Sequence, residues 1–429
     1  IEDLKDEGYL LKQEKVDQNV GQCWRCKTPI EILVKKQWFV AVNKLIEQTK
    51  EAAEEMNWVP EHMKSRMINW ADSMEWDWCI SRQRLFATPI PVWFCKDCGK
   101  VMLPDVEDLP VDPTHDKPKK ACSCGCEEFI GEEDVLDTWM DSSISPLSIA
   151  GWPNEGYENN FPANIRPQGH DIIRTWAFYT TLRCLALTGK KPFDDIVING
   201  MVFGEDGYKM SKSRGNVINP DDIVNDYGAD TLRTYEMFIG AFDAAASWSD
   251  DGVKGCRRFL ERVWKLKDMV TDETGYSKDM ETKMHQTIKK VSNDFENLKY
   301  NTAIAAMMAL INDFYKKGTV TRDEFKTLIV LLNPVAPHIT EELWSLMGFE
   351  GRLFETSWPE FEEEKTVDKV QEIGVQVNGK VRATVALAID ASKEDALAAG
   401  KEAIADKLEG KNIVKEIYVP GRIINIVVK

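Results

Sequence analysis

The spacing of hydrophobic and polar positions changes along the chain and divides it into segments. Over residues 41–70 apolar side chains recur at helical spacing, as in VNKLIEQTKEAAEEM. From about residue 134 apolar runs such as DDIVINGMVFG alternate with helical stretches, which is typical of an α/β domain. From about 252 to 347 the pattern is almost wholly helical, and it predicts a bundle of about four or five helices.

The remaining sequence predicts a small α+β module. The acidic stretch PEFEEEKTVDK is typical of a linker. After it, residues 370–429 follow the pattern of a hairpin, a helix and a further strand. Asn378-Gly379 is a favoured turn dipeptide between two alternating runs, and it indicates where the hairpin turns.

Composition narrows the class of protein. With 429 residues the chain should form about two to four domains. No apolar run approaches the roughly 18 residues that span a bilayer, and the charged opening IEDLKDEGYLLKQEK is not a signal peptide, so we expect a cytoplasmic protein without membrane contact. The net charge of −17 argues against indiscriminate nucleic-acid binding but allows a local basic groove. Because the chain starts with Ile and reads like the interior of a longer sequence, we expect a fragment.

The ten cysteines include pairs at metal-ligand spacing. In a cytosolic protein, such C-x-x-C pairs predict zinc before disulfides. One site would combine Cys95 and Cys98 with two of the three cysteines in ACSCGCEEF. We favour Cys122 and Cys124, because Gly125 supplies the usual knuckle turn, with Cys126 as the alternative to Cys124. Cys23 and Cys26 form only half a site.

A short basic loop stands out in this acidic protein. GEDGYKMSKSRGNVINP places Lys209, Lys212 and Arg214 between Gly207 and Gly215. Such a loop can fold over a run of linked phosphates, where lysines act as mobile point charges. A solvated charged turn is the alternative that spacing alone leaves open.

KMSKS, followed by RGNVINPDDIVNDYGADTLR, resembles the signature of class I aminoacyl-tRNA synthetases. CWRCKTPIE, DVLDTWMDSSISPLSIAGWP and RPQGHDIIRTWAFY make residues 1–216 similar to archaeal-type valyl-tRNA synthetases. YGADTLRTYEMFIGAF, LLNPVAPHITEELW, VQVNGKVRA and VPGRIINIVVK make residues 217–429 similar to bacterial leucyl-tRNA synthetases.

The resemblance implies an α/β fold: the second half of a class I Rossmann-like catalytic domain with a zinc-ribbon insertion, an all-α anticodon-binding bundle and a small α+β C-terminal domain. The expected boundaries are 1–40 for the end of an editing insertion with its cysteine knuckle, 41–251 for the catalytic part (zinc ribbon 93–130, KMSKS loop 204–217), 252–360 for the anticodon-binding domain and 370–429 for the tRNA-binding C-terminal domain.

The same resemblance implies the ATP site. Lys209 and Lys212 would stabilise the pyrophosphate leaving group of Mg²⁺-bound ATP. The remaining loop residues at this site would be Met210, Ser211 and Ser213. In GHD, Gly169 allows close backbone approach and Asp171 would hold the ribose; a helix N-cap is the structural alternative for Asp171.

The resemblance also bears on the amino acid. Trp139 and Trp176 match tryptophans that wall the side-chain pocket in branched-aliphatic synthetases, and GHDIIRTW departs from leucine enzymes, which favours valine over leucine. Such an enzyme would act as a monomer on tRNA. The expected tRNA contacts in the C-terminal domain are Lys380, Arg382 and Arg422.

The sequence lacks the HIGH signature that completes a class I ATP site. We therefore expect a valine–tRNA ligase fragment that is inactive alone. A leucine–tRNA ligase fragment and a non-catalytic tRNA-binding paralogue remain the alternatives.

Overall fold

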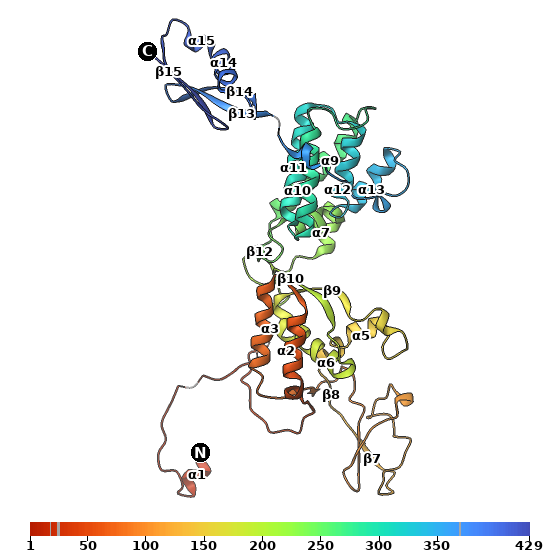
Figure 1. Cartoon of the computed structure of the whole chain (residues 1–429). Coiled ribbons are helices and arrows are strands. Elements are labelled where there is room, and N and C mark those ends of the chain that lie inside the picture. Colours follow the sequence, from red (N-terminus) through yellow and green to blue (C-terminus); the bar gives the residue numbers. More distant parts are fainter. Residues whose placement is uncertain (18, 24–25, 369) are drawn as a thin grey trace. The chain divides into compact units, whose positions relative to one another are not determined.

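The computed structural model describes residues 1–17, 19–23, 26–368 and 370–429 (Figure 1). These residues form two compact units. The first consists of 1–166 and 171–197, and the second of 167–170 and 198–429. The mixed α/β organisation and the helical bundle expected from the sequence are both confirmed. Among the described residues, no helix is both long and apolar enough to cross a membrane.

The first unit is organised around a three-stranded sheet. Its strand order is β2 (Asn57–Val59), β10 (Phe193–Asn199) and β9 (Ala163–Gly169). β10 pairs with β2 in parallel and is buried at Ile196, Val197 and Ile198, as expected for a central strand with both faces covered. The longer helices of this unit pack together: α2 (Ile46–Glu55) packs against α3 (Lys64–Asp72) and against α6 (Phe178–Thr188).

Short elements complete the first unit. They are α1 (Glu2–Asp6), β1 (Phe39–Val40), β3 (Trp78–Cys79), β4 (Ser81–Arg82), β8 (Val135–Leu136), α4 (Thr138–Ser142) and α5 (Ser145–Ala150). β1 pairs with β3, and β4 pairs with β8, both antiparallel.

The cysteine-rich segment forms its own small sheet, with β5 (Trp93–Cys95) between β6 (Val101–Met102) and β7 (Phe129–Gly131). A Cβ at Gly131 would lie 1.9 Å from the carbonyl oxygen of Pro113. Glycine is therefore required where the proline-rich loop crosses β7.

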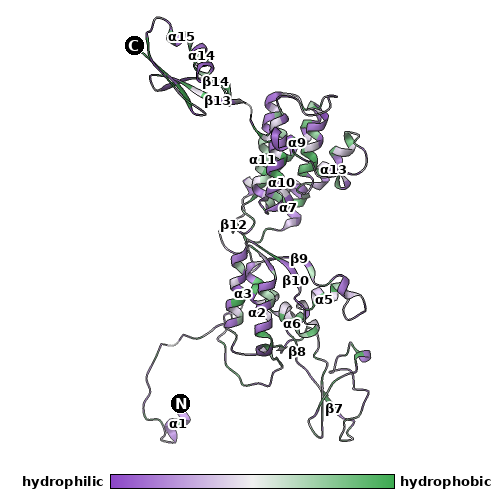
Figure 2. Cartoon of the chain, viewed as in Figure 1, coloured by the Kyte–Doolittle hydropathy of each residue, from purple (hydrophilic) through white to green (hydrophobic). Residues whose placement is uncertain are grey.

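The second unit begins with a short parallel pair, β11 (Val202–Phe203) and β12 (Ala246–Ser247), and two helices, α7 (Pro220–Tyr227) and α8 (Ala229–Phe238). The helical bundle follows. Its helices are α9 (Asp250–Leu266), α10 (Glu281–Glu296), α11 (Tyr300–Lys317), α12 (Arg322–Leu332) and α13 (Pro337–Leu346). Hydrophobic and hydrophilic residues alternate along these helices (Figure 2), and the apolar ones form one buried core.

The C-terminal module has a four-stranded sheet ordered β14 (Lys380–Ala388), β13 (Val370–Val377), β16 (Ile423–Val428), β15 (Ile413–Val419). Two helices, α14 (Lys393–Ala403) and α15 (Ala405–Leu408), accompany it. Asn378 and Gly379 both have positive φ, +50° and +80°, which is the conformation of a two-residue hairpin turn. The predicted hairpin is therefore present.

Candidate functional site

The KMSKS loop folds back on itself between β11 and α7. The amide of Gly204 donates to the carbonyl of Tyr208 at 2.9 Å, and Phe203 forms a bridge with Lys209. Gly207 and Gly215 each have φ +73°. Only glycine adopts this conformation without strain, so the two residues act as the turns of the loop.

Asp206 joins the two arms of this loop. Its carboxylate accepts hydrogen bonds from the Tyr208 amide (3.1 Å), the Arg214 Nε (3.2 Å) and the Asn216 side-chain amide (3.1 Å). These hydrogen bonds, that from Asn216 first, lower the pKa of Asp206. Asn216 in turn accepts the Ser211 amide at 2.9 Å. The backbone of the signature is thus held by a side-chain network.

The three cations of the loop have different surroundings. Arg214 pairs with Asp206 and lies over the Tyr208 ring, with its guanidinium carbon 3.7 Å from the ring centroid. Lys209 and Lys212 are exposed, and within the part of the protein that the structure describes Lys212 has no ion pair. Arg214 therefore stabilises the loop through these contacts, whereas the Lys212 side chain is exposed at the surface.

Met210 anchors the loop. It packs against the apolar cluster of α8 and α9, which contains Leu232, Tyr235 and Trp248. A cavity of about 190 Å³ lies beside Met210 and is lined by the same residues. The only apolar side chain of KMSKS thus fixes the loop to the helices that follow it. Ser211 is half-buried, and its hydroxyl lies 3.3 Å from that of the exposed Ser213.

The GHD stretch follows β9 directly. Gly169 is the last residue of this strand, and a short 3₁₀ turn, His170–Ile172, comes next. Gly169 is half-buried and Asp171 is exposed. Asp171 therefore lies in the turn that directly follows a strand, where its exposed side chain is accessible to a ligand.

Trp139 is carried by the five-residue helix α4, which is held at both ends. At the start, the buried Asp137 accepts the Trp139 amide (3.1 Å) and the guanidinium of Arg82 (2.6 Å). At the end, Arg183 of α6 donates to the carbonyl of Met140. A helix this short has little stability alone, so distant side chains set the position of Trp139.

Trp176 lies in a π-helical segment, Ile173–Ala177, which is in contact with α4. π-Helical turns are frequent at functional sites. Its ring is only 7% exposed: Phe193 stacks on it with centroids 5.5 Å apart, and the Arg166 guanidinium lies over it. The two segments that carry the expected pocket tryptophans therefore meet, but protein side chains cover Trp176.

The sequence reasoning did not find Arg82, Asp137, Arg166 or Arg183. The signal for Asp137 was available, because an aspartate directly before a short helix is a typical N-cap. Its arginine partner has no such signal.

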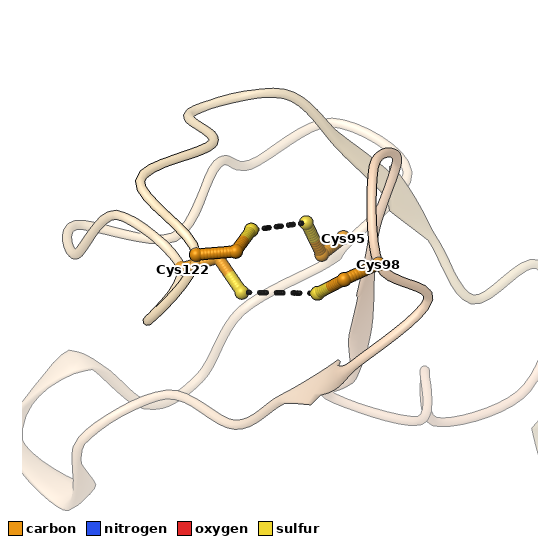
Figure 3. Close-up of side chains that lie close together, drawn as sticks. Cys95, Cys98 and Cys122 are labelled. Carbon is orange, nitrogen blue, oxygen red and sulfur yellow. Dashed lines mark hydrogen bonds between the residues drawn. The ribbon is translucent and has the colours of Figure 1, made fainter.

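Four cysteine thiols converge in the cysteine-rich module (Figure 3). The sulfur of Cys95 lies 3.6 Å from that of Cys124, and that of Cys98 lies 3.6 Å from that of Cys122. All four sulfurs are within 4.8 Å of one another. A tetrahedral zinc ion with bonds of about 2.3 Å requires sulfurs about 3.8 Å apart, so the arrangement fits such an ion.

The turns around these thiols have the form of zinc knuckles. Gly99 and Gly125 follow the second cysteine of each pair, with φ of +69° and +88°. Cys126 lies outside the group: its sulfur exchanges hydrogen bonds with the backbone of Glu128, the amide nitrogen lying at 3.3 Å. The fourth thiol of the cluster is therefore that of Cys124 and not that of Cys126.

The described residues around Cys23 and Cys26 show two features of such a knuckle. The Lys27 amide donates to the Cys23 carbonyl at 2.8 Å, and Lys27 has φ +61°. Trp24 and Arg25 lie outside the described residues. Among the side chains that the structure describes, the four-thiol cluster alone forms a group able to hold a metal ion, so Cys23 and Cys26 remain a pair.

The expected tRNA contacts of the C-terminal module are exposed. Lys380 and Arg382 lie at the start of β14, and Arg422 precedes β16. Their exposure allows contact with a phosphate backbone but is also common for solvated cations.

Comparison with known families is consistent with this geometry. The family model for class I tRNA synthetases (I, L, M and V) matches residues 6–247, more than half of the protein. The chain belongs to the class I tRNA synthetases. A second model, the anticodon-binding domain of tRNA ligase, matches residues 277–397.

Curated relatives of this chain include several valine–tRNA ligases. That of Methanothermobacter thermautotrophicus is 51% identical, over 89% of this chain and 47% of the relative. That of Methanopyrus kandleri is 45% identical, over 87% of this chain and 45% of the relative. The chain spans about half the length of the curated relatives it matches. Because these matches cover nearly nine-tenths of the chain, the similarity to valine ligases continues beyond residue 216.

Solved structures add the leucine resemblance. A leucyl-tRNA synthetase of Agrobacterium radiobacter K84, in a ternary complex with tRNA, shares 29% identity with a TM-score of 0.61 over 82% of this chain and 51% of that one. A methionyl-tRNA synthetase of Mycobacterium tuberculosis, 18% identical with a TM-score of 0.53 over 77% and 67%, shares the fold. The expected resemblance to valyl- and leucyl-tRNA synthetases is thus confirmed.

Proposed function

We propose that this chain is the part of a valine–tRNA ligase that contains the KMSKS loop and the anticodon-binding helices. The ligase would use ATP to activate valine and transfer it to tRNA(Val). The observation that carries the proposal is the 51% identity to a valine–tRNA ligase over 89% of the chain, which includes the KMSKS loop. The KMSKS loop is common to the class, but the match also spans the expected pocket tryptophans Trp139 and Trp176, and a pocket sets specificity, so the identity supports the same substrate.

The loop would act on the triphosphate of Mg²⁺-bound ATP. Valine attacks the α-phosphate through its carboxylate, and pyrophosphate leaves. Lys209 and Lys212 would stabilise the negative charge that grows on the pyrophosphate, an interaction that is stronger in the transition state than in the ground state. Met210 would keep the loop on its helices while Lys212 moves at the surface. Gly169 and Asp171 would hold the adenosine. With the HIGH signature absent, the ATP site would be incomplete and this part inactive alone.

The amino-acid pocket would be formed by Trp139 and Trp176. An apolar wall suits valine, because a branched aliphatic side chain offers only dispersion and desolvation for recognition. One methylene changes binding by about 1–3 kcal/mol, so the exact placement of the wall matters for discrimination. Asp137, Arg82 and Arg183 would therefore act on specificity indirectly, by holding α4.

The four-thiol cluster would bind one zinc ion. The donors are Cys95, Cys98, Cys122 and Cys124. Four thiolates leave no open coordination position, so the ion would be structural and would stabilise the folded insertion.

The tRNA would bind to the second unit. We assign residues 252–360 to the anticodon-binding domain and 370–429 to a C-terminal tRNA-binding domain, with Lys380, Arg382 and Arg422 as phosphate contacts. The family match over 277–397 supports the anticodon-binding role of the bundle and runs past residue 360 into the C-terminal module. The other assigned boundaries are 1–40 for the end of the editing insertion and 41–251 for the catalytic part.

Binding of the protein to transcripts of tRNA(Val) and tRNA(Leu) tests the proposal, measured at two salt concentrations. A preference for tRNA(Val) at both supports it. A preference for tRNA(Leu) favours the second candidate, a leucine–tRNA ligase, which the leucyl-tRNA synthetase structure supports. Equal binding that salt abolishes would mean phosphate contacts alone.

Catalysis needs a separate experiment. The chain is joined to the upstream half of the Methanothermobacter thermautotrophicus ligase, and valine-dependent ATP–pyrophosphate exchange is measured. We expect exchange with valine that is lost in Lys212→Ala. Exchange with neither valine nor leucine, despite tRNA binding, would favour the non-catalytic paralogue.

A further inference from the structure

Arg166 is a half-buried arginine whose polar edge has no partner among the described residues. Its Nε is buried without a hydrogen-bond partner, and among the described residues the side chain makes no hydrogen bond or ion pair. The guanidinium instead lies over Trp176, with its carbon 3.8 Å from the ring centroid. Burial, with no contribution from a carboxylate, lowers the pKa of Arg166. A cation in such a place usually has a counter-charge.

The other partly buried arginines of this unit show what the usual arrangement is. Arg82 pairs with the carboxylate of Asp137 at 2.6 Å. Arg183 donates to the carbonyl of Met140 and to the Ser143 hydroxyl. Both hold α4 and are explained by packing. Arg166 has neither an acid nor a carbonyl partner among the described residues, so holding the fold does not explain it.

A second polar group on the same strand is also unsatisfied. Gln168 is 5% exposed, and its side-chain oxygen has no partner among the described residues. Successive side chains of a strand alternate between its faces, so positions 166 and 168 share one face of β9, while Ile165 and Pro167 are exposed. Buried polar side chains are rarely left without partners. The unsatisfied atom of Gln168 is an acceptor, however, so the case for an anionic ligand rests on Arg166.

The chemistry of Arg166 selects the ligand class. Its π-face is occupied by Trp176, which leaves the N–H edge as the donor surface. That edge has the fork geometry that matches the two oxygens of a carboxylate or phosphate. We propose that Arg166, stacked on Trp176, is the binding residue for an anionic group of a ligand, a carboxylate or a phosphate. This site shares Trp176 with the proposed amino-acid pocket, but it is argued from the contacts of Arg166 and not from the valine ligase assignment.

Nitrogen-15 NMR of the whole protein tests the proposal, because the arginine Nε–H resonance reports directly on the unsatisfied donor. The resonance of Arg166 is assigned by its absence in Arg166→Lys. The protein is titrated with valine, with AMP and with inorganic pyrophosphate, each against sodium chloride at matched ionic strength. We expect a saturable shift of the Arg166 resonance with at least one of them.

The ligands separate the two sources of the anion. Saturation by valine alone assigns a carboxylate site, and saturation by AMP and pyrophosphate assigns a phosphate site. The matched control is Arg174, which also lies over a tryptophan, at 5.9 Å from Trp70, but is exposed. Its resonance should follow ionic strength only.

Calorimetry gives a second measurement. Arg166→Gln should weaken binding of the anion found by NMR at least tenfold, and Arg174→Gln should leave it unchanged. If no probe shifts the Arg166 resonance saturably, or if Arg166 and Arg174 respond alike, the proposal is wrong. Because the assignment uses Arg166→Lys alone, the titration of the unsubstituted protein decides this even if Arg166→Gln fails to fold. Since tRNA binding is measured separately, failure here leaves the proposed function standing.

Discussion

Asp230 of α8 caps the start of α13, although Asp230 and His338, the second residue of α13, are 108 positions apart in the sequence. From α8, its carboxylate accepts the Ile339 amide at 2.6 Å and lies 2.7 Å from Nδ1 of His338, both at the start of α13. Asp230 is buried, whereas the His338 side chain is 74% exposed. This carboxylate therefore connects α8, which follows the KMSKS loop, with α13, the last helix of the bundle.

Removing this cap should destabilise the bundle. Asp230→Ala leaves the first amides of α13 without an acceptor, and we expect a loss of about 2 kcal/mol in the free energy of unfolding. Urea denaturation followed by circular dichroism measures it. Asp251→Ala is the matched control, because that aspartate is exposed and pairs only with Lys254, at 3.5 Å, among the described residues. Equal stability of the two variants would contradict the capping role.

Asp206 should control the mobility of the KMSKS loop. Asp206→Ala removes the hydrogen bonds from Arg214 and Asn216 that join the arms, together with the local one from Tyr208, so we expect amide exchange over residues 208–216 to become at least several-fold faster. Hydrogen-exchange mass spectrometry measures this in the protein alone. Lys212→Ala should leave exchange unchanged, because the structure gives Lys212 no part in the network. Unchanged exchange in Asp206→Ala would show that the loop is held elsewhere.

Zinc analysis should distinguish the cysteines of the ACSCGC segment. We expect about one zinc per molecule, lost in Cys122→Ser and in Cys124→Ser because each removes one of four thiolates. Cys126→Ser should retain the ion, since that sulfur bonds with the Glu128 backbone instead. The reverse result for Cys124 and Cys126 would exchange their roles.

Thiol reactivity should depend on pH differently at three cysteines. Hydrogen bonding with Thr28 lowers the pKa of the exposed Cys26 to about 7, while burial raises the pKa of Cys184 to about 12 and of Cys256 to about 11. Because the thiolate reacts, alkylation of Cys26 in the metal-free protein should rise several-fold from about pH 6 to 7 and level off above about pH 8. Cys184 and Cys256 should react only after unfolding. Mass spectrometry after iodoacetamide treatment checks this, and equal labelling of the three folded thiols would contradict it.

The sequence predicted the order of the elements well, because hydrophobic periodicity reports local structure directly. The Asn378-Gly379 hairpin and the helical bundle are examples. What it could not predict is which distant side chains meet. Arg82 reaches Asp137 across 55 residues, and Arg183 reaches Met140 across 43. No local pattern encodes such pairs, since they depend on how the elements pack.

The candidate sites show the same division. The spacing of Cys95 and Cys98, and the glycine after Cys124, are local signals, and they led to the four thiols that the structure gathers. The pocket tryptophans came from resemblance. Neither the local sequence signals nor the resemblance indicated that Arg166 lies over Trp176. The role of Trp176 in a pocket stays a prediction.

Met210 has a consequence for how this protein could have evolved. The KMSKS loop belongs to the compact unit made of residues 167–170 and 198–429, and Met210 packs on helices of that unit. An exchange of the sequence upstream of Ile198 would therefore leave the loop and its supporting helices together. An exchange between Asp206 and Asn216 would separate hydrogen-bonded partners. Ancestral recombination, where it occurred, should have left its junctions outside this interval, and the loop should be inherited with its helices.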